Sequence, residues 1–143
     1  MILPDVNTLL YAVNRSSNQH AAALRALRSG FEDPRGVAFA WTVLLAFLRL
    51  STRRGIFPKP LSVEDALCVI ERWLEHPQAQ VVHPGESHAQ ILGRLLRSAG
   101  TAGNLTTDTH LAALAIENGA TVLSFDRDFA RFDDVQWMLP PDS

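Results

Sequence analysis

The chain has 143 residues and a formal net charge of −2, with 13 lysines and arginines against 15 aspartates and glutamates. Its hydrophobic share of 47% and charged share of 20% are those of one ordinary globular domain over residues 1–143, which excludes disordered and fibrous classes. No apolar run approaches the ~18 residues of a membrane span, and no basic region followed by an apolar stretch opens the chain. The single Cys68 excludes both an internal disulfide and a zinc site built from cysteines. We therefore expect a cytoplasmic protein.

Strand and helix patterns alternate along the whole chain, and apolar periodicity separates the two. In chain order the sequence predicts a strand over residues 1–6, helices over 8–13 and 21–27, a strand over 36–40, helices over 42–50 and 63–75, a strand over 80–83, helices over 86–99 and 107–118, and strands over 121–125 and 135–138. Strands that alternate with helices predict a parallel sheet covered on both faces, a three-layer α/β/α sandwich.

Several residues mark where these helices begin and end. Gly30 and Gly119 are expected to stop the helices that precede them, and a loop is expected to open at Gly100 and Gly103.

Two polar residues are expected to open helices. Thr42 is expected to cap the helix over 42–50. Ser62, with Asp65 three residues later, is typical of a capping box at the start of the next helix.

Four aspartates fall where a parallel sheet collects ligands, at the carboxyl ends of its strands. Asp5 ends the first strand, Asp126 and Asp128 follow the strand over 121–125, and Asp108 lies in the first turn of the helix before that strand. Each alone is better explained as a turn residue or a helix-terminal charge, and only their joint placement reverses this preference. Together at one edge they would repel one another unless a cation held them, and oxygen donors of this kind favour Mg²⁺ or Mn²⁺.

The segments that contain these aspartates resemble the PIN-domain nucleases, and within them the VapC-type toxins of bacterial toxin–antitoxin pairs. The resemblance rests on the runs DVNTLLYA at residues 5–12, GNLTTDTHLAALAIE at 103–117 and GATVLSFDRDF at 119–129, with weaker support from LLAFLRL at 44–50. It covers essentially the whole chain, and its second half is the more specific part.

This resemblance implies a PIN-like α/β/α sandwich and a metal-dependent endoribonuclease that cleaves RNA with Mg²⁺ or Mn²⁺. By motif position, the catalytic and metal-binding acids would be Asp5, Asp108 and Asp126, with Asp128 as a further metal ligand. Asn7 and Ser124 match positions whose short polar side chains orient the site. The resemblance also implies a homodimer and a cognate VapB-type antitoxin as partner, with no membrane.

One position departs from the family pattern. Many PIN nucleases carry a glutamate on the helix after the second strand, where this chain has Ala46, and no acidic residue lies between Asp33 and Glu64. Three explanations compete: three acids with Asp128 suffice, Arg49 reaches the substrate phosphate, or activity is weakened and the protein binds RNA or a partner without cutting. We favour the first.

Other candidate contacts are weaker. Arg49, Arg15 and Arg127 are candidates for RNA binding, although each is equally consistent with an exposed surface charge. The three tryptophans, Trp41, Trp73 and Trp137, are candidates for stacking on bases, with packing in the core as the ordinary alternative. The apolar helices over 63–74 and 21–27 are candidates for contact with an antitoxin helix.

Histidines and lysines exclude other chemistries. No histidine has a spacing that indicates a metal ligand or a general base, and His110 is expected to face away from Asp108 on their shared helix. Phosphatases of the haloacid dehalogenase type and phospho-acceptor receiver domains both require a lysine late in the chain. The only lysine, Lys59, lies between two prolines in the middle of the chain, which disfavours both classes.

Overall fold

A parallel five-stranded sheet in the order β3-β2-β1-β4-β5 forms the centre of the protein. We describe a computed structural model that covers residues 1–55, 57–100 and 102–142, so Thr101 of the expected glycine loop lies outside the described residues. The strands are β1 (Ile2–Pro4), β2 (Val37–Phe39), β3 (Ala79–Val81), β4 (Thr121–Leu123) and β5 (Trp137–Met138). Every neighbouring pair is parallel, which confirms the predicted α/β/α fold, although each strand is shorter than the sequence pattern indicated.

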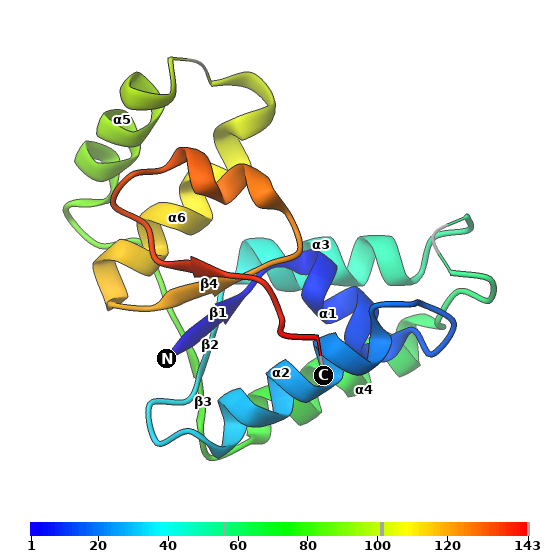
Figure 1. The fold of residues 1–143 in the computed structure, drawn as a ribbon. Coiled ribbons are helices and arrows are strands. Elements are labelled where there is room, and N and C mark those ends of the chain that lie inside the picture. Colours follow the sequence, from blue (N-terminus) through cyan, green and yellow to red (C-terminus); the bar gives the residue numbers. More distant parts are fainter. Residues whose placement is uncertain (56, 101, 143) are drawn as a thin grey trace.

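Helices cover both faces of this sheet. They are α1 (Val6–Val13), α2 (His20–Glu32), α3 (Trp41–Ser51), α4 (Val63–Glu75), α5 (His88–Ala99) and α6 (Thr106–Asn118), with short 3₁₀ helices η1 (Gly103–Leu105) and η2 (Arg127–Arg131). Figure 1 shows α5 and α6 packed together on one side of the sheet and α1, α2 and α4 on the other, with α3 against α1. Among the described residues, no helix is long and apolar enough to cross a membrane.

The central strands are apolar on both faces because both faces are covered. Leu3 of β1, Val37 of β2 and Val122 of β4 are fully buried, as are Phe47 of α3 and Ala113 of α6. A strand between two helical layers has no solvent-facing side, so its sequence reads as a continuous apolar run. This core fixes the carboxyl ends of β1, β2 and β4 at one edge of the sheet.

Gly30 does not end α2, which contradicts the expectation from the sequence. The helix continues to Glu32, and Gly30 is buried inside it against β1 and β2. A Cβ atom at this position would lie 2.5 Å from Cδ1 of Ile2 and 3.0 Å from Cγ2 of Val37. The glycine therefore allows the helix to approach the sheet closely, which local sequence signals do not reveal.

The other three helix boundaries test the capping predictions. Thr42 does not cap α3: the helix begins at Trp41, its N-cap is Ala40, and no side chain caps it. Ser62 does cap α4, because its Oγ accepts a hydrogen bond of 3.1 Å from the Asp65 amide. Gly119 ends α6 as predicted, in the left-handed conformation with φ of 63°.

Candidate functional site

Four aspartates meet beyond the carboxyl ends of β1 and β4, as the strand topology predicts. Asp126 follows β4 and caps η2, Asp128 lies in the first turn of η2, and Asp108 lies in the first turn of α6. One carboxylate oxygen from each of these three residues lies within 4.8 Å of the others. We call Asp108, Asp126 and Asp128 the acid cluster.

Asp5 lies beside the acid cluster and is more deeply buried, with 8% of its surface exposed. It follows β1 and caps α1, where its Oδ1 accepts a hydrogen bond of 2.7 Å from the Val6 amide. Asp5 and Asp108 line the same small pocket, which is about 30 Å³ in volume. The first strand therefore contributes a carboxylate that touches the edge of the cluster.

Ser124 and Asn7 connect β1 to β4 at the site. The Ser124 hydroxyl is fully buried; it donates a hydrogen bond of 2.8 Å to Asp5 Oδ2 and accepts one of 3.0 Å from the Asp126 amide. Asn7 Nδ2 donates to Ser124 Oγ over 3.1 Å, and its Oδ1 accepts from the Phe125 amide over 3.1 Å. These bonds fix Asp5 relative to the loop that carries Asp126, an arrangement that suits the orienting role proposed for both residues.

Thr8 is a third link that the sequence analysis missed. Its hydroxyl is fully buried on α1 and donates a hydrogen bond of 2.9 Å to the carbonyl oxygen of Leu123 at the end of β4. The available signal was a polar residue directly before Leu9 and Leu10, on the face of α1 that faces the sheet. Trp137 of β5 adds a similar contact, because its Nε1 donates to the carbonyl oxygen of Ser124 over 3.2 Å.

Two acids of the site, Asp108 and Asp5, hold their protons more tightly than isolated carboxyl groups. Burial, together with the negative charges of Asp5, Asp126 and Asp128, raises the pKa of Asp108 to about 6. Burial also raises the pKa of Asp5, although its hydrogen bonds from Ser124 and Val6 act in the opposite direction. Like charges at close range need a compensating cation, and carboxylate oxygens are the donors that Mg²⁺ and Mn²⁺ prefer, so the residues present fit such an ion.

Ala46 lines the small pocket together with Asp5 and Asp108, as do Thr42 and Val43 of the same helix. The helix α3 therefore borders the acids but contributes a methyl group in place of a carboxylate. Because no acidic residue lies between Asp33 and Glu64, α3 cannot supply a metal ligand of this type from another position.

The three candidate arginines lie at different distances from the acids along the chain. Arg127 is exposed between Asp126 and Asp128, and Arg49 is exposed on α3. Arg15 follows the far end of α1, whose eight residues span about 12 Å from the Asp5 end. Within residues 1–55, 57–100 and 102–142 none of the three forms an ion pair, whereas Arg131 approaches Asp128 at 3.9 Å.

Two histidines form a cluster that the sequence did not indicate. His88 Nδ1 hydrogen-bonds to Glu117, and His88 Nε2 lies 2.9 Å from Nδ1 of His110. Since His110 contacts α5 in this way, it faces away from the acid cluster as expected. The unforeseen part is that His88 and Glu117, which are 29 positions apart in sequence, come together because α5 packs on α6.

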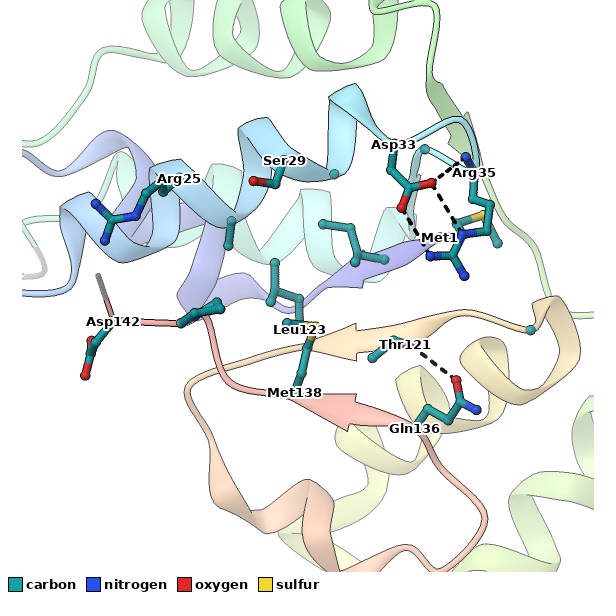
Figure 2. A pocket seen from close by; sticks show the side chains of 16 residues that line it. Met1, Arg25, Ser29, Asp33, Arg35, Thr121, Leu123, Gln136, Met138 and Asp142 are labelled. Atoms are coloured by element: carbon teal, nitrogen blue, oxygen red, sulfur yellow. Dashed lines mark hydrogen bonds and ion pairs between the residues drawn. The ribbon is translucent and has the colours of Figure 1, made fainter.

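A pocket larger than the one beside Asp5 and Asp108 is separate from the acids. It has a volume of about 500 Å³ and lies between α2 and the strands β1, β4 and β5. Figure 2 shows Arg25 and Ser29 of α2 on one side of it and Thr121, Leu123 and Met138 of the strands on the other. None of the four aspartates lines this pocket, so its size does not identify the site.

Comparisons with known proteins agree with this geometry. The PIN domain family matches residues 2–135. Ribonuclease VapC37 of Mycobacterium tuberculosis is 48% identical over 141 residues, which cover 99% of this chain and 98% of that protein. Among solved structures, VapC20 of Mycobacterium tuberculosis, a toxin that cleaves the sarcin-ricin loop, is 21% identical with a TM-score of 0.67 over 95% of this chain and 99% of its own. VapBC2 of Rickettsia felis, bound to a DNA fragment from its promoter, is 19% identical with a TM-score of 0.70 over 97% and 98%.

Proposed function

Because this chain belongs to the PIN domain family, we propose that it is a metal-dependent endoribonuclease that acts as the toxin of a toxin–antitoxin pair. The observation that carries the proposal is the convergence of Asp108, Asp126 and Asp128, whose carboxylate oxygens lie within 4.8 Å of one another. A relative that is 48% identical to this chain over nearly its full length is a ribonuclease, which supports RNA as the substrate.

In this proposal Asp108, Asp126 and Asp128 hold Mg²⁺ or Mn²⁺, and Asp5 completes the catalytic acids from the adjacent strand. A bound divalent cation supplies Lewis-acid chemistry, because it lowers the pKa of water and neutralises charge on phosphate oxygens. The pKa of Asp108 is raised to about 6, so this carboxyl is mostly ionised at neutral pH and would compete with protons for a cation only at lower pH. Ser124 and Asn7 hold Asp5 in place through their hydrogen bonds.

Because α3 carries Ala46 where the family pattern has a glutamate, the site has one carboxylate fewer than that pattern. This favours a site that holds few metal ions. Asp128 compensates in number, since it brings a third carboxylate into the acid cluster. Ala46 borders the pocket of about 30 Å³ that Asp5 and Asp108 also line. We therefore retain cleavage as the function and treat RNA binding without cleavage as the alternative to be tested.

The proposed partners are a VapB-type antitoxin, RNA and a second copy of the chain, and the proposed location is the cytoplasm, where such substrates occur. Support for the antitoxin comes from the fold, which is shared over 97% of this chain with a toxin solved as a VapBC complex. The exposed Val63 and Leu67 lie four residues apart on α4, the helix that the sequence indicated as an antitoxin contact.

The deciding experiment is incubation of the purified protein with total RNA in Mg²⁺ or Mn²⁺, followed by sequencing of the new RNA ends. We expect discrete new ends with the natural protein and none with Asp108→Asn or with a chelator. The matched control is Asp65→Asn, because Asp65 also lies in the first turn of a helix but is exposed on α4. RNA that is bound but uncut by the natural protein would support the alternative.

A further inference from the structure

Trp41 is a partly exposed aromatic side chain at the start of α3. It is 45% exposed, and no ring pair in the described part of the chain includes it. The other two tryptophans have structural contacts: Trp73 packs edge-on against Phe47 with ring centres 4.9 Å apart, and Trp137 donates a hydrogen bond to the backbone beside the site. Of the three, Trp41 is exposed, whereas Trp73 and Trp137 are half-buried, so Trp41 is the best placed to contact a ligand.

Trp41 is next to the proposed catalytic acids along the chain and in the fold. It is the first residue of α3, directly after the segment that leaves the carboxyl end of β2. The following residue, Thr42, lines the small pocket together with Asp5 and Asp108. The backbone of Trp41 therefore adjoins the pocket in which the acids meet.

The side of the site formed by α3 differs in charge from the side formed by the acids. Trp41, Leu45 and Arg49 are exposed on α3 at intervals of four residues, so they lie along one face over about 12 Å. This face carries no negative charge, since no acidic residue lies between Asp33 and Glu64. A nucleic acid strand whose phosphate reaches the acids can contact α3 without repulsion, through an aromatic ring and then a cation.

We propose that Trp41 stacks on an unpaired RNA base next to the scissile phosphate. This inference rests on the proposed ribonuclease function and assigns to it a residue that contacts a base of the substrate. A base within an A-form duplex is stacked on its neighbours and is not available to an aromatic side chain, whereas bases in loops and single strands are. Stacking also suits an acidic site because it does not depend on charge.

The first test is steady-state cleavage of a short unstructured RNA by the natural protein and three variants. Trp41→Ala is expected to raise KM about tenfold with kcat within twofold, because stacking on one base contributes about that much to binding. Trp41→Phe keeps an aromatic ring and should retain most of the affinity. Leu67→Ala removes a 38% exposed apolar side chain on α4, away from this face, and should leave KM unchanged. A KM for Trp41→Ala within twofold of the natural protein would overturn the inference.

The second test changes the RNA in place of the protein. Removal of the base on one side of the cleaved bond should cost the natural protein about the same factor as Trp41→Ala, and the two changes together should cost no more than either alone. The opposite result is that the loss from Trp41→Ala and the loss from base removal multiply, whichever side of the cleaved bond lacks its base. That result would show that the ring contacts neither base, which contradicts the proposal.

A third measurement separates failure of this inference from failure of the proposed function. Binding of labelled RNA to the Asp108→Asn variant in Mg²⁺ reports on Trp41 even if no RNA is cut. Weaker binding when Trp41→Ala is added supports the stacking contact, and unchanged binding overturns it. Light scattering on Trp41→Ala tests the other occupant of this face: a drop in molar mass, with RNA binding unchanged, would assign Trp41 to contact between copies of the chain.

Discussion

The helix α6 carries two clusters of ionisable side chains, one near each end, and they are built in opposite ways. Near its first turn, Asp108 meets Asp126 and Asp128, so groups of the same charge face one another. Near its last turn, Glu117 meets His88, a residue that can complement it. The same helix therefore holds one cluster that lacks a counter-charge and one that supplies its own.

The cluster at His88 is satisfied within the protein. The side chains of His88 and Glu117 are only 12% and 11% exposed, His88 also bonds to His110 over 2.9 Å, and Glu117 accepts a hydrogen bond of 2.8 Å from the Gly85 amide. These bonds connect α5, α6 and the loop before α5. Its role is structural, because both ring nitrogens of His88 and both carboxylate oxygens of Glu117 have partners within the protein.

The acid cluster has no such partner among the described residues except the exposed Arg131, at 3.9 Å from Asp128. Burial and like charge raise the pKa of Asp108 to about 6, so the folded chain holds these groups in an unfavourable arrangement. Both clusters contain ionisable residues, so their presence alone does not identify a binding site. What distinguishes the acid cluster is that, Arg131 aside, its carboxylates lack partners of opposite charge in the described part of the chain. Four changes test this difference.

The largest expected effect follows from Asp108→Asn. Cleavage of RNA should fall by about two to three orders of magnitude, because the loss of a carboxylate weakens metal binding and charge stabilisation together. Stability at pH 7.5 should stay equal or rise, because a like charge has been removed from the acid cluster. Cleavage rates and urea unfolding measure the two effects. Retained cleavage with reduced stability would show that Asp108 has a structural role like that of Glu117.

The opposite result is expected for Glu117→Ala. Removal of a buried partner leaves His88 and the Gly85 amide without their bonds and should lower the free energy of unfolding by about 2–3 kcal/mol. Cleavage at 25 °C should remain within twofold of the natural protein. Glu86→Ala, on the exposed loop nearby, serves as the control and should change neither quantity. A large loss of cleavage in a folded Glu117→Ala protein would contradict the separation of the clusters.

Ser124→Ala tests a residue that stabilises the acids without contacting substrate. Its hydroxyl bonds to Asp5 and to the Asp126 amide, so its loss should reduce metal affinity by about tenfold, as is usual for groups that orient ligands. Calorimetric titration with Mn²⁺ measures the affinity. Ser124→Thr restores the hydroxyl and should recover part of it. Equal Mn²⁺ affinity in all three proteins would remove Ser124 from the site.

The smallest effect is a dependence on pH. Because the pKa of Asp108 is about 6, metal affinity should fall up to tenfold for each pH unit below that value, and about half a proton should be released per metal bound at pH 6. The folded pKa lies above the unfolded value, so protonation of Asp108 stabilises the metal-free protein at low pH, and this contribution is lost as pH rises through about 6. Asp126→Asn should move both transitions to lower pH. Transitions that stay in place would show that like charge does not act on Asp108.

Sequence patterns predicted the order of strands and helices because each element buries an apolar face with its own period. They also predicted that Asp5, Asp108 and Asp126 approach one another, since carboxyl ends of parallel strands share an edge. Gly30 was misread because its role depends on contact with Ile2 of another element. The bond between His88 and Glu117 was missed for the same reason, as it depends on how α5 packs on α6.

Distance along the chain decides when the site can exist. Asp5 leaves the ribosome well before Ser124, whose hydroxyl holds it and which lies 119 positions later. The central strand β1 likewise waits for β4 before it gains its second neighbour in the sheet. Contacts of such long range form late in folding. A chain under synthesis therefore carries Asp5 without the other acids, and the assembled site appears only after the segment through Asp128 has been made.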